Sequence, residues 1–309
     1  MNHELNSTMQ PFAPGDVFVG ATLLNNPDDD HAGKGRIIQY DEHLNEKGML
    51  WTEGTSHLIS GLSFGPDNNL WAFDGWSWLT IRVSPDGKQL PNKQYAERCL
   101  SGVYFADDGS MYFTEGVDGH NQPEPLTTRH KLLPGESSKL GDGDIYHFSS
   151  TGNLLATYDP DIHGGMSGSM AVTHGTLSAD KSRLIYVSET GPRLMQFDLN
   201  AGKQLADLQC FEEHKGEMFF DLTSTGDGRL LITRGARLDI LDEQGNTLKQ
   251  IPLAEFGWSL VATSDHSNIA YVGNWFSGVV ARLNIESGEI SAQVTIAPKC
   301  IAGIAQYPG

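Results

Sequence analysis

A repeated pattern of strands and turns constrains the fold of this chain more than any other feature. Residues 176–209 show it most clearly: runs of strand-forming residues alternate with the polar turns Ala179-Asp180-Lys181-Ser182 and Asn200-Ala201-Gly202-Lys203. Each run has the length of an ordinary strand, and each break contains residues that suit tight turns. Four short antiparallel strands joined in this way form one blade of a β-propeller.

The same pattern recurs along most of the chain. It is found again at residues 64–87, 105–152, 225–245 and 264–288. The period is roughly 40–50 residues, which is typical of propeller repeats. The sequence therefore predicts an all-β fold, a six-bladed β-propeller, with seven blades as the alternative.

The two ends of the chain complement each other in this pattern. Residues 16–54 hold the later strands of a blade without a first strand, and residues 300–308 offer one strand without the rest. We therefore expect the C-terminal strand to join the N-terminal blade and close the ring, because an open ring would leave unpaired strand edges. Residues 1–15 are polar and contain two prolines, so we expect a loose N-terminal arm followed by a single propeller domain at 16–309.

Charge and composition exclude several functions. The 309 residues carry a formal net charge of −18, which argues against binding nucleic acid or an anionic membrane. No apolar run approaches the length of a membrane span, and the first residues lack the features of a secretory signal. Three cysteines without framework spacing indicate a reduced, cytoplasmic setting. We expect a small-molecule substrate, with a protein partner as the alternative.

Polar residues end the second strand of five repeats and form the main candidate site. They are Asp74, Glu115, Glu189, Arg234 and Asn274. In symmetric blades these side chains would form a partial ring over one channel mouth. Asp74, Glu115 and Glu189 would hold a divalent metal, calcium or zinc, while Arg234 and Asn274 would bind substrate oxygens. The alternative is that each residue caps its own turn.

Aromatic residues and loops complete the candidate site. Trp76 and Trp275 follow two of the ring positions and are typical of the walls of ligand pockets, although burial between blades is the alternative. Residues 116–142 interrupt the repeat and are predicted to be a lid. His163 and His214 lie on loops that enter channel strands, and we expect them to transfer protons unless they are merely exposed.

Several of these segments resemble a known superfamily. Residues 178–190, followed by 193–198, are similar to a blade of the regucalcin/gluconolactonase and strictosidine-synthase-like superfamily, and residues 60–67 and 101–108 are similar to its channel strands. The resemblance implies a six-bladed propeller and a calcium- or zinc-dependent lactone or ester hydrolase.

The metal ligands of that superfamily do not carry over. Its members use a Glu, an Asn and an Asp on three channel strands, whereas the matching positions here are Ser60, Ser101, Thr173, Phe220, Trp258 and Ala302. Glu217, His174 and Asp221 lie near such positions only after a register shift. Two hypotheses stand: a metal-dependent hydrolase of a small polar lactone or ester, and a non-catalytic propeller that binds a protein or a small ligand.

Overall fold

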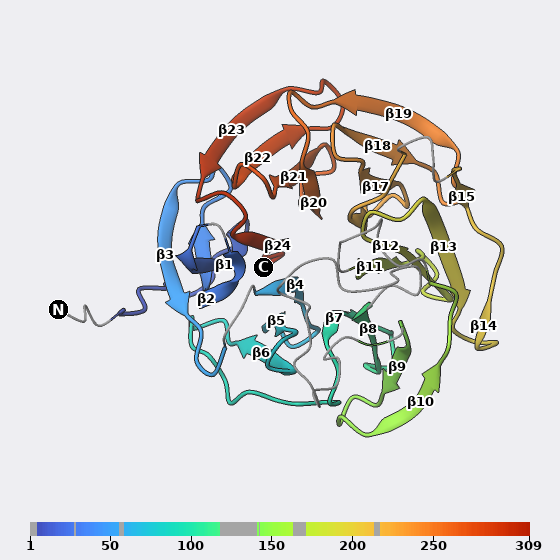
Figure 1. Cartoon of the computed structure of the whole chain (residues 1–309), viewed down its shortest axis with the longest axis horizontal. Coiled ribbons are helices and arrows are strands. Elements are labelled where there is room, and N and C mark those ends of the chain that lie inside the picture. Colours follow the sequence, from blue (N-terminus) through green and yellow to red (C-terminus); the bar gives the residue numbers. More distant parts are fainter. Residues whose placement is uncertain are drawn as a thin grey trace. The chain divides into compact units, whose positions relative to one another are not determined.

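Every regular element of this protein is a strand in the part of the chain that its computed structural model describes (Figure 1). That part comprises residues 5–27, 29–55, 59–117, 141, 143–162, 171–212 and 217–309. Within these ranges there is no helix that could cross a membrane. The prediction of an all-β chain is confirmed, and the strands follow a propeller-like arrangement of small antiparallel sheets.

The chain divides into two compact units. The first contains residues 1–96 and 262–309, and the second contains residues 97–261.

In the first unit, the last strand of the chain pairs with the first. The sheet has the order β24-β1-β2-β3, and Val17 lies opposite Gln306 in an antiparallel register. This confirms that the C-terminal strand joins the N-terminal sheet. Its strands are β1 (Val17–Asn26), β2 (Asp29–Tyr40), β3 (Glu46–Trp51) and β24 (Ile301–Gln306).

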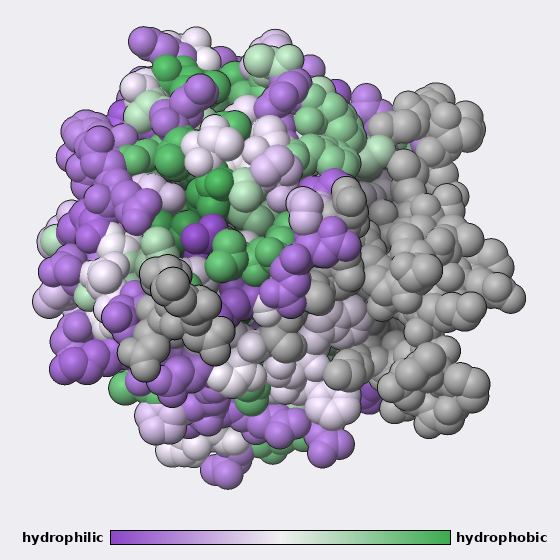
Figure 2. Space-filling model, turned by 60° about the vertical axis from the view of Figure 1, so that its left-hand side comes forward, coloured by the Kyte–Doolittle hydropathy of each residue, from purple (hydrophilic) through white to green (hydrophobic). Residues whose placement is uncertain are grey.

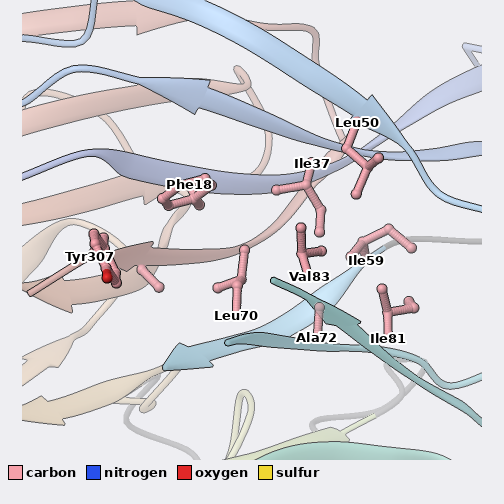
Figure 3. Close-up of a cluster of buried hydrophobic side chains, with 10 residues drawn as sticks. Phe18, Ile37, Leu50, Ile59, Leu70, Ala72, Ile81, Val83 and Tyr307 are labelled. Atoms are coloured by element: carbon pink, nitrogen blue, oxygen red, sulfur yellow. The ribbon is translucent and has the colours of Figure 1, made fainter. Parts of the chain in front are cut away.

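Apolar side chains from this sheet pack with those of the next one. Phe18, Ile37 and Tyr307 meet Leu70 and Ile81 in one buried cluster (Figure 3). Successive side chains of a strand point to opposite faces of its sheet, so every second residue, such as Leu70 and Ala72 on β5, faces this core. The second sheet consists of β4 (Ser60–Phe64), β5 (Leu70–Asp74) and β6 (Leu79–Val83).

A four-stranded sheet of the order β20-β21-β22-β23 covers residues 258–295, of which residues 262–295 belong to the first unit. Its strands are β20 (Trp258–Thr263), β21 (Ile269–Asn274), β22 (Val279–Asn284) and β23 (Ile290–Thr295). Asn284 closes one of its turns by accepting hydrogen bonds from the amides of Glu286 and Ser287, both at 2.9 Å. The polar turn residues therefore do what the sequence pattern predicts.

The N-terminal arm is not loose in the part that the structure describes. The Thr8 amide donates to the Met49 carbonyl at 2.7 Å, and the Phe12 amide donates to the Pro85 carbonyl at 2.8 Å. The expectation of a loose arm is wrong for residues 5–15, because Met9 and Phe12 pack against the core of the first unit. The division into an arm and one domain stays a prediction.

The second unit contains a nine-stranded sheet that is two smaller sheets joined at one point. The order runs β10-β9-β8-β11-β12-β13-β14, with β7 also on β8 and β15 on β13. Within the described residues the joint is short, and β8 and β11 pair at Val117–Ala171 and Gly116–Val172. The strands are β7 (Leu100–Phe105), β8 (Met111–Val117), β9 (Ile145–Phe148), β10 (Leu154–Tyr158), β11 (Ala171–Leu177), β12 (Arg183–Ser188), β13 (Arg193–Asp198), β14 (Lys203–Gln204) and β15 (Gln209–Cys210).

A last sheet completes this unit. It has the order β16-β17-β18-β19 and is formed by β16 (Leu222–Ser224), β17 (Leu230–Thr233), β18 (Arg237–Leu241) and β19 (Thr247–Pro252). Ile185, Leu194 and Phe219 pack with Leu222 and Ile232 in a buried cluster between this sheet and its neighbour. The strand order of the sheets does not by itself fix the number of blades, so six blades stay a prediction.

Candidate functional site

The clearest polar site of the second unit is a histidine–aspartate pair. Nδ1 of His174, on β11, lies 3.2 Å from Oδ1 of Asp221, directly before β16. The two side chains are 12% and 14% exposed, so the pair is largely shielded but still reaches solvent. Strand alternation explains the contact, because Thr176, two residues after His174, also reaches β16 and lies 2.8 Å from the Ser224 hydroxyl.

Backbone amides fix the carboxylate of this pair. Oδ1 of Asp221 accepts a hydrogen bond from the Leu222 amide at 2.7 Å, and Oδ2 accepts one from the Val261 amide at 2.9 Å. Burial raises the pKa of the Asp221 carboxyl, while His174 and the two amides oppose this shift. A carboxylate on Nδ1 orients an imidazole and stabilises its protonated form, and the opposite nitrogen, Nε2, then suits proton transfer.

Hydroxyl groups also contact β11. The Ser101 and Thr114 hydroxyls donate to the Thr173 carbonyl at 2.8 and 3.1 Å. The Tyr104 hydroxyl fills space left by a missing side chain, since a Cβ at Gly102 would lie 2.7 Å from it. Burial raises the pKa of Tyr104, so its phenol stays neutral at ordinary pH. These contacts tie β7 and β8 to β11 and hold the strand that carries His174.

Glu115 and Glu189, two of the predicted metal ligands, flank one residue of β11. Gly116 lies opposite Val172, and the Glu189 amide donates to the Val172 carbonyl at 2.8 Å. Glu115 is fully buried, and its Oε1 accepts hydrogen bonds from the amides of Gly143 and Asp144, both at 2.9 Å. Burial raises the pKa of the Glu115 carboxyl from 4.5 to about 7.

Asp74 and Asn274, which belong to the first unit, bind their own turns. Oδ1 of Asp74 accepts from the amides of Trp76 and Ser77 at 3.1 and 3.3 Å, and Oδ2 accepts from the Ser77 hydroxyl at 2.9 Å. Oδ1 of Asn274 accepts from the Ser277 amide at 3.1 Å. These contacts favour the alternative in which both residues cap turns.

Arg234 belongs to a buried ion network. Its guanidinium reaches Glu217 at 2.7 Å and Asp239 at 3.2 Å, and its carbon lies 4.0 Å from the ring centre of Phe219. The Nε of Arg234 also donates to the Met218 carbonyl at 2.6 Å. Glu217 bonds Arg237 as well, at 2.8 Å, and Asp239 also bonds both arginines, so two carboxylates balance two guanidinium groups. A role of Arg234 in substrate binding stays a prediction.

Of the other predicted site residues, the structure describes the two tryptophans but not the two histidines. Trp76 and Trp275 belong to the first unit and are half-buried, and the Trp275 ring packs edge-on against Phe276 at 5.0 Å. His163 and His214 lie outside the described residues, as does most of the predicted lid at 116–142. Their roles stay predictions.

The donor set for a metal is incomplete in the described part of the chain. There, no group of three or more His, Cys, Asp and Glu side chains is placed to hold an ion. The backbones of Glu115 and Glu189 lie on either side of Val172, and two carboxylates alone do not supply the six to eight oxygens that a calcium ion takes. The third predicted ligand, Asp74, uses both carboxylate oxygens in its turn.

Sequence reasoning did not find the His174–Asp221 pair. The two residues are far apart in sequence, and each matches a ligand position of the superfamily only after a register shift. The alternation Thr173, His174, Gly175, Thr176 on a strand does place a histidine and a hydroxyl on one side of β11. The partner on β16, however, depends on how two sheets pack, which no local pattern encodes.

Comparisons with known proteins support the fold. No protein-family model and no curated protein matches the sequence. A chain of the nidogen/laminin complex is similar in structure, with a TM-score of 0.65 and 12% identity over 95% of this chain and 98% of that one. The β-propeller domain of Cps50 (Swd1) from Myceliophteria thermophila has a TM-score of 0.57 and 12% identity over 98% and 93%.

An enzyme is also among the similar structures. A gluconolactonase from Xanthomonas campestris has a TM-score of 0.55 and 14% identity over 86% of this chain and 85% of that one. At these identities the similarities show a β-propeller fold and nothing about activity.

Proposed function

We propose that this protein hydrolyses a small polar lactone or ester, with His174 as general base and Asp221 as the group that orients it. One observation carries the proposal: a shielded imidazole faces a carboxylate at 3.2 Å, and that carboxylate is itself fixed by two backbone amides. Such preorganisation is what a general base requires. The similarity to a gluconolactonase fold is compatible with this reading.

The reaction can be written with these two residues. Nε2 of His174 takes a proton from water as the water oxygen attacks the carbonyl carbon. Asp221 stabilises the imidazolium through Nδ1. The tetrahedral intermediate then collapses, the carbon–oxygen bond to the leaving group breaks, and the imidazolium returns the proton to the leaving alkoxide. Proton transfer of this kind contributes typically 10²- to 10⁴-fold to the rate.

The fold proposed for this function is a six-bladed propeller. The nine-stranded sheet is compatible with it, because its two halves pair at two positions among the described residues and so can be counted as two blades. Together with the other four sheets, these two halves support a count of six. The cytoplasmic location and the small-molecule partner predicted above belong to the same proposal.

Kinetic analysis of matched histidine variants tests the general base. We expect His174→Gln and Asp221→Asn to lower kcat/KM at least 100-fold on whichever of a panel of sugar lactones and aryl esters the wild type hydrolyses. His147→Gln is the control, since His147 is another half-buried histidine of the second unit, stacked on Tyr112 at 4.1 Å. Full activity of a folded His174→Gln variant would exclude the assignment.

A divalent metal is tested separately. A bound cation would polarise the substrate carbonyl, and Glu115 and Glu189 are the residues proposed to contribute to its site. Calorimetric titration with calcium and zinc should show weaker binding for Glu115→Gln and Glu189→Gln than for the wild type. Equal affinities in all three proteins, or no binding in any, would remove the metal from the proposal.

The second candidate function is a non-catalytic binding module. It is favoured by the similarity to a chain whose structure was solved in a nidogen/laminin complex. Here the His174–Asp221 pair would only link β11 to β16. The binding module predicts no turnover on the whole panel and a similar loss of stability in His174→Gln and Asp221→Asn.

A further inference from the structure

We propose that the first unit carries a groove that recognises an extended peptide, and that this groove is occupied by residues 7–12 of the same chain. The groove is formed by the free edge of β3, the turn after β6 and an aromatic pocket. All of these belong to the first unit. The proposal is independent of the catalytic function proposed above.

Backbone pairing at the edge of β3 provides the first contact. β3 is the outer strand of its sheet. The amides of Thr8 and Met9 both donate to the Met49 carbonyl, at 2.7 and 2.9 Å. In return, the Ser7 hydroxyl accepts from the Trp51 amide at 3.0 Å, and the Thr8 hydroxyl accepts from the Met49 amide at 3.2 Å. Addition of an extended segment to an open sheet edge is a common mode of peptide recognition.

An aromatic anchor provides the second contact. The Phe12 ring lies 4.5 Å from Phe18, 5.4 Å from Tyr307 and 6.0 Å from Phe64, measured between ring centres. The backbone is fixed at the same place, because the Phe12 amide donates to the Pro85 carbonyl. One large aromatic side chain in a preformed pocket is the usual energetic centre of an interface.

Two glycines make room for the segment. A Cβ at Gly48 would lie 2.3 Å from the Thr8 carbonyl oxygen, and one at Gly87 would lie 2.9 Å from the Gln10 carbonyl oxygen. Gly87 also has a φ of +80°, which its turn requires, whereas Gly48 has no such need. The close approach of the peptide therefore explains why residue 48 is a glycine.

A series of hydrogen-bonded polar side chains binds the backbone in the middle of the peptide. The Gln10 amide donates to Oε1 of Gln39 at 2.8 Å, and Nε2 of Gln39 donates to Asp16 at 2.7 Å. Asp16 is held in turn by Lys47 at 2.6 Å. Gln39 is completely buried, and its bond to Asp16, which lies outside the segment, orients its Oε1 toward the Gln10 amide. The ligand chemistry is thus a pair of small hydroxyl residues followed, four positions after the second, by an aromatic side chain.

The experiment separates docking from ordinary loop packing. The full-length Phe12→Ala variant should release the segment, so that the amides of Met49 and Trp51 exchange hydrogen at least tenfold faster than in the wild type. A labelled peptide of residues 5–14 should then bind this variant and slow the exchange again, but should not bind the wild type, whose groove is filled. Leu5→Ala is the control, because Leu5 is exposed.

One further protein variant and one altered peptide complete the test. Gly48→Ala should also release the segment while leaving the pocket intact, and the same peptide carrying alanine in place of Phe12 should bind neither variant. The proposal is overturned if exchange at Met49 and Trp51 is unchanged in Phe12→Ala and Gly48→Ala, or if exchange rises but the peptide does not bind.

Discussion

The Glu115 carboxylate and the Gly143 amide are joined by a hydrogen bond of 2.9 Å, and Gly141 approaches the same carboxylate so closely that a Cβ there would lie 2.1 Å from it. A fully buried glutamate thereby fixes the chain where it enters β9. Because burial raises its pKa to about 7, this anchor titrates near neutral pH.

The titration of Glu115 predicts a pH-dependent stability. Its pKa is about 7 in the folded protein and near 4.5 in the unfolded chain, so the native state binds more protons between these values. The free energy of unfolding should therefore fall as pH rises from 4.5 to 7, by at most about 3 kcal/mol from this group. Urea unfolding of wild type and Glu115→Gln at pH 5 and 7.5 measures the difference. Parallel pH profiles of the two proteins would contradict it.

The Arg234 network predicts that lysine cannot replace this arginine. Lysine would lose the planar stacking on Phe219 and could not reach Glu217, Asp239 and the Met218 carbonyl together. We expect Arg234→Lys to cost about 3 kcal/mol of unfolding free energy, since Asp239 would keep only the more exposed Arg237 as its ion-pair partner. Arg229→Lys is the control and should change stability by less than about 0.5 kcal/mol, because Asp227, its partner, is exposed. Equal effects of the two substitutions would refute the argument.

Close packing of β1 predicts a strong effect of a single methyl group. A Cβ at Gly20 would lie 2.0 Å from the Ile59 carbonyl oxygen, and Gly303 on β24 lies directly opposite. Gly20→Ala should therefore destabilise the protein by about 3 kcal/mol, as overpacking does where backbone cannot move away. The Cβ of Gly226→Ala meets nothing within 4 Å, so this variant should melt like the wild type. Thermal melts of both variants and of the wild type measure these differences in stability.

Much of the fold could be predicted because its information is local. Turns such as Asp242-Glu243-Gln244-Gly245 hold themselves through Asp242, whose Oδ1 accepts from the Gln244 amide at 3.0 Å. The strands between such turns follow from short runs of strand-forming residues, such as Leu184 to Val187. Even the pairing of β24 with β1 could be inferred, because the N-terminal repeat lacks a first strand and the C-terminal residues supply one.

The site was harder to predict, because its contacts depend on packing between sheets. The turn-capping role of Asp74 was foreseen as an alternative, whereas the partners of Arg234 were not. The docking of Phe12 was missed for a related reason. A polar segment with two prolines looks unstructured until one knows that an aromatic pocket and an open strand edge lie within its reach.

Removal of residues 300–309 should disrupt the first unit. It would delete β24, uncover the edge of β1 and take Ile301, Ile304 and Tyr307 from buried positions. We expect the unfolding transition of this unit to lose its cooperativity in calorimetry. Removal of residues 308–309 alone, which are exposed, is the control and should have little effect. A chain without residues 300–309 that melts like the full one would rule out this role of β24.

The pairing of β24 with β1 also sets the order in which the chain can mature on the ribosome. The hydrogen bond from Gln306 to the Gly15 carbonyl connects positions 291 residues apart, so β1 leaves the exit tunnel long before its neighbour has been synthesised. The second unit, by contrast, is one continuous segment, residues 97–261, and can form as soon as it emerges. The strands nearest the N-terminus therefore spend most of translation with an open edge, and they are the part of this protein that depends most on protection from aggregation during synthesis.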